Sequence, residues 1–269
     1  MEMAHDFTAD KAAAQPAAEP VFFHPDREPA RIRPLKALHH FRELIKDKEN
    51  TEHVFHIFQS LPRPGFLKDA EDYMASDKGR AIRAAEPHLP DLLDNHDLLR
   101  TMPEGSVAHA YCDFMEKEGL SAAGLEAEFD KFMPRRFGDQ VEWYANRQRD
   151  THDLLHVLTG YGRDALGEQC VLAFTYGQNP AFANLFIAYA GGWNMKKTVK
   201  SDAPVFKAIR QAQKMGKACP RVSEIDITAF LAMPLDEARR SMNIEAPTYY
   251  RQAHEQFRSE GIDPYDMLT

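Results

Sequence analysis

The feature that most constrains the fold of this chain is the spacing of its apolar residues. From Ile32 onward they recur at steps of three and four positions, first at Leu35, Leu38, Phe41, Leu44 and Ile45. This spacing gathers apolar side chains on one face of an α-helix, whereas a half-buried strand would alternate at every second position. After this first segment the same period predicts helices over 52–59, 69–85, 104–118, 138–159, 164–177, 180–197, 204–215, 235–242 and 247–259.

Proline and glycine separate these predicted helices, as in Pro62-Arg63-Pro64-Gly65, Asn179-Pro180 and Ala246-Pro247. The sequence contains no convincing run of alternating strand pattern and no internal repeat. We therefore predict an all-α fold with a single helical domain over residues 32–269. Residues 1–31 are rich in proline and alanine and offer little to bury, which predicts a disordered arm.

Charge and cysteine usage exclude several classes of protein. The formal net charge is 33 − 41 = −8, which gives a nucleic-acid partner little electrostatic support. The three cysteines are odd in number, far apart and never in a Cys-x-x-Cys pair. This pattern indicates a reducing compartment and argues against both a disulfide framework and a cysteine-based zinc site.

The location of the protein is predicted from what its sequence lacks. No segment reaches the ~18 consecutive apolar residues of a membrane-spanning helix. The first residues have neither the pattern of a secretory signal nor, with Glu2, Asp6 and Asp10, the acid-poor character of a transit peptide. We expect a cytoplasmic protein of a bacterium, for which attachment to a membrane surface stays open.

One segment carries a recognisable chemical pattern, with His152, Asp153 and His156 inside a predicted helix. Each helical residue advances ~100°, so His156 lies about 40° around the axis from His152. Two imidazoles at positions i and i+4 are a common helical way to chelate one metal ion. Solvated or core histidines are the ordinary alternative. Asp153 either ligates the metal or accepts a proton, and its position leaves both roles open.

The residues after this helix predict a turn and a second helix. Gly160 and Gly162 suit a C-terminal cap and a tight turn, and Asp164 suits the N-cap of a helix from Ala165. Glu168 would then face the histidines across a helical hairpin. The mixed nitrogen and oxygen ligands favour zinc, iron(II), manganese or cobalt over magnesium.

These residues resemble the coenzyme Q (ubiquinone) biosynthesis protein 4 family. Its hallmark is His-Asp-x-x-His, eleven residues and then Glu, which His152 to Glu168 reproduce without deviation. The resemblance extends to the segments 102–106 and 234–239 and covers roughly 35–250. Val107-Ala108-His109 departs from the family pattern, which leaves room for a related substrate.

The resemblance implies a membrane-associated helical protein that holds a divalent metal at His152, Asp153, His156 and Glu168. Zinc is the favoured ion, with iron or manganese as alternatives. The implied reaction is oxidative decarboxylation, or C1 hydroxylation, of a polyprenyl hydroxybenzoate precursor, with Asp153 as the catalytic residue. The alternative is a lipid-binding scaffold that organises other ubiquinone biosynthesis proteins. Implied partners are a polyprenylated aromatic quinone precursor and the inner face of the bacterial membrane, and a homodimer is compatible with them.

Three further features have competing interpretations. Arg147 and Arg149 precede the motif and are candidates for binding a substrate carboxylate, although solvated arginines are equally ordinary. An aromatic stripe either lines a groove for a polyprenyl tail or packs in the core, and the lysines at 196, 197 and 200 follow it. A His-Asp phosphohydrolase would need a further histidine and aspartate, for which no motif is present. The stripe consists of Phe182, Leu185, Phe186, Tyr189 and Trp193.

Overall fold

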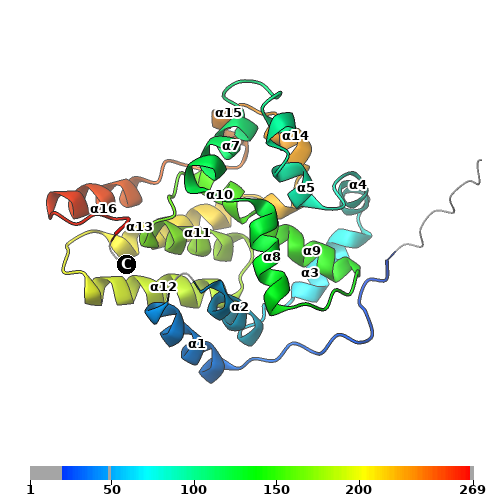
Figure 1. Cartoon of the computed structure of the whole chain (residues 1–269), viewed down its shortest axis with the longest axis horizontal. Helices are drawn as coiled ribbons and strands as arrows, with labels where there is room; N and C mark the ends of the chain where they lie inside the picture. Colours follow the sequence, from blue (N-terminus) through cyan, green and yellow to red (C-terminus); the bar gives the residue numbers. More distant parts are fainter. Residues whose placement is uncertain (1–19, 48–49, 267–269) are drawn as a thin grey trace, which may run out of the picture.

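Helices form all the regular structure in the described residues of the computed structural model, which are 20–47 and 50–266 of the 269-residue chain. No β-strand occurs in these ranges, and one isolated bridge joins Ser106 to Pro234. The predicted all-α class is confirmed (Figure 1). The helices are α1 (Pro34–Lys46), α2 (Thr51–Ser60), α3 (Phe66–Ala75), α4 (Asp77–Ala85), α5 (Leu89–Leu93), α6 (His96–Leu99), α7 (Val107–Glu118), α8 (Ala122–Phe132), α9 (Gln140–Asp150), α10 (His152–Thr159), α11 (Ala165–Gln178), α12 (Phe182–Thr198), α13 (Val205–Ala218), the 3₁₀ helix η1 (Val222–Glu224), α14 (Ile227–Leu231), α15 (Leu235–Ser241) and α16 (Thr248–Ser259).

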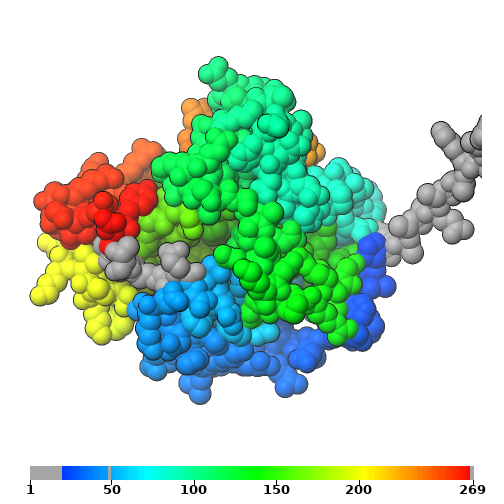
Figure 2. Space-filling view, viewed as in Figure 1, coloured from blue at the N-terminus to red at the C-terminus, as the bar shows by residue number. Residues whose placement is uncertain are grey.

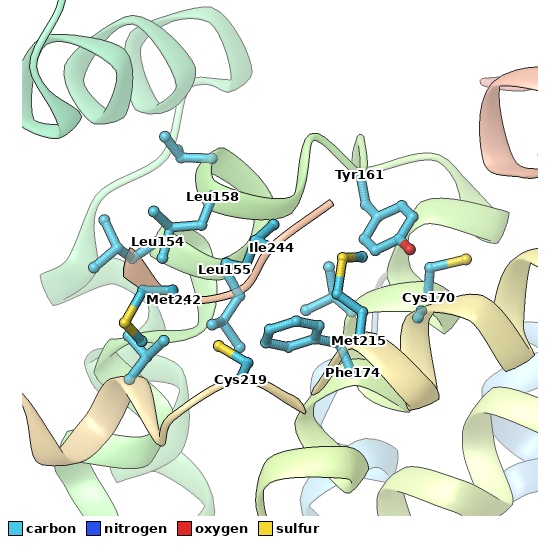
Figure 3. Packing of buried hydrophobic residues seen from close by; sticks show 14 of the residues in the cluster. Leu154, Leu155, Leu158, Tyr161, Cys170, Phe174, Met215, Cys219, Met242 and Ile244 are labelled. Carbon is cyan, nitrogen blue, oxygen red and sulfur yellow. The ribbon is translucent and has the colours of Figure 1, made fainter. Parts of the chain in front are cut away.

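The centre of the molecule is α11, which packs against both α12 and α13. Glycines allow the closest approach, because a side chain at Gly216 of α13 would collide with the backbone carbonyl of Phe174 in α11. Figure 3 shows Phe174, Met215 and Leu155 directed into one shared interior. The helix α10 thereby shares a core with α11 and α13, and this core fixes its place beside α11.

A second set of contacts holds α10 from its other side. The helix α7 packs against α10, and the large buried cluster includes Tyr111 and Met115 of α7 together with Leu154 and Leu158 of α10. All four side chains are fully buried. Because α10 is enclosed on two sides, its polar residues are held in a rigid setting.

The helix predicted over 138–159 is interrupted at Thr151. The first part, α9, ends at Asp150, and α10 begins at His152. The Thr151 hydroxyl donates to the carbonyl oxygen of Arg147 at 3.0 Å, one turn back. Such a bond competes with the regular backbone ladder and bends helices. The two histidines therefore lie on a short helix of their own.

The described part of the predicted arm, residues 20–31, contains no helix but contacts the domain; residues 1–19 lie outside the described residues. The carbonyl oxygens of Val21 and Phe22 accept hydrogen bonds from the backbone N–H groups of Gln140 and Val141, at 3.0 and 3.2 Å. Asp139 accepts from the Arg27 guanidinium at 2.7 Å. This segment follows the edge of the molecule (Figures 1 and 2) and satisfies N–H groups that the first turn of α9 leaves free.

Candidate metal centre

The turn between α10 and α11 has the geometry that its sequence predicts. Gly160 ends α10 in the left-handed conformation, with φ 73°. The Asp164 carboxylate accepts from the backbone N–H groups of Leu166 and Gly167, both at 3.2 Å, and caps α11. Glu168 consequently lies in the first turn of α11. The predicted helical hairpin is confirmed.

Three of the four predicted ligands meet across this hairpin. The Oε2 atom of Glu168 lies 3.5 Å from Nε2 of His152 and 3.5 Å from Nε2 of His156. One ligand atom from each of the three residues lies within 4.8 Å of the others. Two imidazole nitrogens and a carboxylate oxygen at this spacing suit one divalent ion, with further positions open to water or substrate.

The orientation of His156 supports a metal at this point. Its side chain is fully buried, and Nδ1 lies 3.0 Å from the carbonyl oxygen of Tyr161. A proton on Nδ1 donated to that carbonyl leaves the lone pair on Nε2, which is the arrangement of a metal-ligating histidine. Nε2 itself is buried and has no hydrogen-bond partner among the described residues. Phe114 of α7 stacks on the ring, with centroids 5.4 Å apart and planes tilted by 17°.

The charges of the cluster support one another. Burial acts to lower the pKa of His156, but the Glu168 carboxylate and, more weakly, Asp153 outweigh it, so the pKa is raised. Partial burial acts to raise the pKa of Glu168, but His156 and His152 hold it well below its usual range. Without a metal, the cluster therefore favours a protonated His156 paired with an ionised Glu168.

Asp153, the fourth predicted ligand, does not join the three that meet. Its side chain is 9% exposed, and its oxygens fall outside the group whose ligand atoms lie within 4.8 Å. Burial and the Asp153 charge together raise the pKa of Tyr111 on α7. The helical position explains this placement, because Asp153 is turned ~100° from His152. Asp153 acts on His156 through its charge and is not one of the three clustered ligands.

The two arginines predicted to bind a substrate carboxylate have other partners. Arg147 is buried, and its guanidinium lies 2.5 Å from Glu86 and donates to the Ser223 carbonyl at 2.8 Å. Arg149 donates to its neighbour Asp150 at 2.7 Å. A distant buried acid engages Arg147 and the adjacent buried Asp150 engages Arg149, and the break at Thr151 places both arginines on α9 rather than on the helix of the histidines. The structure does not bring either of them to the cluster.

A different arginine lies beside the cluster. Arg163, in the turn between α10 and α11, has its Nε atom 3.6 Å from Oε1 of Glu168, and its side chain is 39% exposed. Arg163 lies outside the residues predicted from the sequence to bind a substrate carboxylate. Its place between Gly162 and Asp164 was the available signal, because that turn joins the two ligand-bearing helices.

The aromatic stripe on α12 packs partly in the core and partly lines a surface groove, and its use for a polyprenyl tail stays a prediction. A shallow groove of about 620 Å³ runs along it, and Phe186 also packs edge-on against Phe41 of α1. Phe182 and Trp193, at the two ends, are 48% and 61% exposed. Lys197 lies over the Trp193 ring, 5.3 Å from its centroid. The groove is lined by Leu61, Phe182, Leu185, Phe186, Tyr189, Ala190 and Gln213.

Comparison with known proteins gives a consistent family. A family model described as Coenzyme Q (ubiquinone) biosynthesis protein Coq4 matches residues 45–248. The chain is 24% identical over 217 residues to a mitochondrial ubiquinone biosynthesis protein COQ4 of Candida tropicalis, covering 78% of this chain and 64% of that protein. A Podospora anserina relative is 24% identical, with coverages of 80% and 70%. A Neurospora crassa relative is 27% identical, with coverages of 75% and 56%. The chain thus spans less than two thirds of two of these three relatives.

A solved structure shares the fold. It is a crystal structure of a protein provisionally named for ubiquinone biosynthesis, from Nostoc punctiforme PCC 73102. The superposition has a TM-score of 0.57 at 18% sequence identity and covers 80% of this chain and 100% of that one. At this identity the likeness concerns the helical architecture alone.

These comparisons correct the location predicted from the sequence. The three fungal relatives are described as mitochondrial proteins, which conflicts with a cytoplasmic protein at the inner face of the bacterial membrane. The prediction relied on the composition of the first residues, a segment that the family match, beginning at residue 45, does not include. In the described ranges no helix combines the length and the apolar character needed to cross a membrane.

Proposed function

This chain belongs to the coenzyme Q (ubiquinone) biosynthesis protein Coq4 family, and from that premise we propose that it serves ubiquinone biosynthesis through a divalent metal held by His152, His156 and Glu168. The observation that carries the proposal is the buried Nε2 atom of His156. It has no hydrogen-bond partner in the described residues and lies 3.5 Å from Glu168. Without a metal this nitrogen has only the long ion pair with Glu168, and an ion coordinated between the two would give both atoms a close partner.

The ligand types favour zinc, with iron or manganese as alternatives. Three protein ligands leave room for substrate, which is the arrangement of catalytic rather than structural sites. When bound, such an ion supplies Lewis-acid stabilisation to ring carboxylate or phenolate oxygens. Tyr161 holds His156 in the required tautomer through its carbonyl oxygen, and Phe114 fixes the plane of the ring.

The reaction we propose is oxidative decarboxylation of a polyprenyl hydroxybenzoate at ring carbon C1. The bond between the ring and the carboxyl carbon breaks, the carboxyl group leaves as carbon dioxide, and a ring carbon–oxygen bond forms. This change oxidises the substrate by two electrons, and we name dioxygen as the oxidant and the source of the new oxygen atom. The second oxygen atom leaves as water, with two protons from solvent and two electrons from an external two-electron reductant. Arg163, partly exposed beside Glu168, is the cation available to orient the substrate carboxylate.

Asp153 has a supporting part in this proposal. It is buried, and its charge helps to raise the pKa of His156. We assign it the task of keeping the imidazole electron-rich and correctly protonated while substrate binds. Asp153→Asn keeps the size of the side chain and removes its charge. A loss of turnover with unchanged metal content is the expected result.

Profiling of quinone intermediates tests the reaction. Removing the protein from its host is expected to deplete ubiquinone and to accumulate prenylated precursors that retain the ring carboxylate. Wild-type protein should restore ubiquinone, whereas Glu168→Ala should not. His88→Ala, at an exposed histidine that pairs with Glu126 elsewhere, is the control and should restore it. Normal ubiquinone in the Glu168→Ala strain would reject catalysis at this cluster.

A second candidate function is a lipid-binding scaffold for other ubiquinone biosynthesis proteins, favoured by the exposed α12 surface. Phe182, Trp193 and Lys197 there combine apolar area with positive charge, which suits a polyprenyl tail or an anionic membrane surface. Flotation with vesicles that contain anionic lipid is the test. Trp193→Ser and Lys197→Glu should each reduce binding if this surface is used. Unchanged flotation in both would remove the support.

A further inference from the structure

We propose that His96, Cys112 and Glu116 form a second metal site, separate from the hairpin, that takes a divalent ion of the zinc class. Nitrogen, sulfur and oxygen ligand atoms from the three residues lie within 4.8 Å of one another. The mixed set includes a potential thiolate, which selects zinc over magnesium or calcium. The proposal does not depend on the function assigned to the hairpin.

Two neighbouring helices bring these side chains together. Cys112 and Glu116 are four positions apart on α7, so they lie on the same face one turn apart. His96 begins the short helix α6, which packs against α7. The Nδ1 atom of His96 lies 3.1 Å from Oε1 of Glu116. An ion bound here would join α6 to α7.

The neighbouring arginine leaves this arrangement intact. Arg100 donates to the other oxygen of Glu116, Oε2, at 2.9 Å, and to Asp113 at 2.7 Å. Oε1 therefore stays directed toward His96. Hydrogen bonds to the free oxygen of a ligating carboxylate commonly orient such ligands, and Arg100 is placed for this task.

Cys112 supplies the ligand that gives the site its selectivity. Its side chain is fully buried, and burial raises the pKa of the thiol, so the group is protonated when no metal is present. Coordination forms a metal–sulfur bond, and the thiol proton passes to solvent. The absence of any Cys-x-x-Cys pair argued against a cysteine-based site. A single cysteine that the fold places beside a histidine and a glutamate leaves no such pattern in the sequence.

The two metal sites lie on different sides of α7. Phe114, which stacks on His156 of the hairpin, is two positions from Cys112 and is thus turned about 200° around the helix. The hairpin ligands contain no sulfur. A spectroscopic signal from a metal–sulfur bond therefore reports on the second site alone.

Cobalt(II) provides that signal. The full chain loaded with cobalt should show a thiolate-to-cobalt charge-transfer band in the near ultraviolet. Cys112→Ser should abolish the band, and Cys219→Ser, at another buried thiol, should retain it. His156→Ala should also retain it, which separates this result from any failure of the hairpin site. Absence of the band at saturating cobalt, or its persistence in Cys112→Ser, would overturn the proposal.

If Cys112→Ser does not fold, a substitution of the exposed ligand Glu116 tests the second metal site instead. Glu116 is 53% exposed, so Glu116→Gln should fold and should weaken cobalt binding at the thiolate site by at least about tenfold. Asp113→Asn is the matched control, because Asp113 also pairs with Arg100 but lies outside the cluster. It should leave the affinity unchanged. Equal effects of the two changes would show that Arg100, and not a metal, accounts for the role of Glu116.

Discussion

The Nε2 atom of His156 and the Oε2 atom of Glu168 lie 3.5 Å apart across the α10–α11 hairpin. This distance exceeds that of a good hydrogen bond. It is close to the separation of about 3.4 Å between two ligand atoms that each lie about 2.1 Å from one tetrahedral zinc ion. The spacing is therefore compatible with one ion shared between the two atoms.

The amount of bound metal should depend on His156 and Glu168. We expect purified wild-type protein to retain a divalent ion at the hairpin and His156→Ala to lose it, because the change removes the most buried ligand. Elemental analysis of both proteins, made on the Cys112→Ser background so that the second site does not contribute, measures the difference. His88→Ala serves as the control and should match the parent. Equal metal in His156→Ala and its parent would contradict the assignment.

The hydrogen bonds that Tyr250 makes to the turn of the hairpin should stabilise the fold. Tyr250 of α16 donates to the Asp164 carboxylate and accepts from the N–H group of Gly162 at 2.9 Å. Tyr250→Phe leaves both groups short of a partner, and we expect it to lower the free energy of unfolding by about 1–3 kcal/mol. Urea denaturation measures the change. Tyr249→Phe, at the exposed neighbouring ring, should stay within about 0.5 kcal/mol of wild type, and a similar loss there would refute the explanation.

Arg147 and Arg163 should behave in opposite ways. Arg147→Met leaves the buried Glu86 without its ion-pair partner and is expected to cost about 3–5 kcal/mol of unfolding free energy. Arg163→Met, at an exposed position, should cost less than about 0.5 kcal/mol but should raise KM for a carboxylate substrate. Denaturation and steady-state kinetics separate the two effects. If Arg147→Met is as stable as wild type, the structural role given to Arg147 fails.

The junction of α1 and α2 should be sensitive to acid. Burial, with help from His56 and His53, lowers the pKa of His40 from 6.5 to about 4. Lys36 and His39 are the other charged or titratable groups that lower it. Between these two pKa values the unfolded chain binds more protons than the folded chain. The contribution of His40 to the free energy of unfolding is therefore fully present above pH 6.5 and is lost as the pH falls toward 4.

Hydrogen exchange of the α1 amides across this pH interval measures the effect. In wild type the protection should fall as the solution is acidified, and in His40→Gln it should fall less, because the titrating group is gone. His39→Gln, at the exposed neighbour that contributes less to this pKa shift than burial does, should stay closer to wild type than His40→Gln. A pH profile of His40→Gln that is identical to that of wild type would exclude His40 as the cause.

The hairpin could be predicted because all its signals are local. Gly160, Asp164 and the spacing from His152 to Glu168 act within a few turns of one another. The partners of Arg147 could not be predicted, because Glu86 is 61 positions away and only the fold brings the two together. The helix α8 was missed for another reason. Its apolar residues Leu125, Phe129 and Phe132 recur at steps of four and three, but the segment is short and Ala122 is its only buried residue, so it adds little to the core.

The interruption at Thr151 has a consequence for insertions and deletions in this region. In one continuous helix, adding or removing a residue upstream would rotate every later side chain by about 100° and carry both histidines away from Glu168. Here the rotational phase of His152 and His156 is set by the turn from Gly160 to Asp164 and by the core beneath α10. Because the helix is interrupted at Thr151, the rotation of the α10 side chains about their axis does not depend on that of α9. A change in length in the loop before α9 therefore leaves the rotation of the two histidines unaltered, whereas a change within the seventeen positions from His152 to Glu168 would alter the spacing of the ligands.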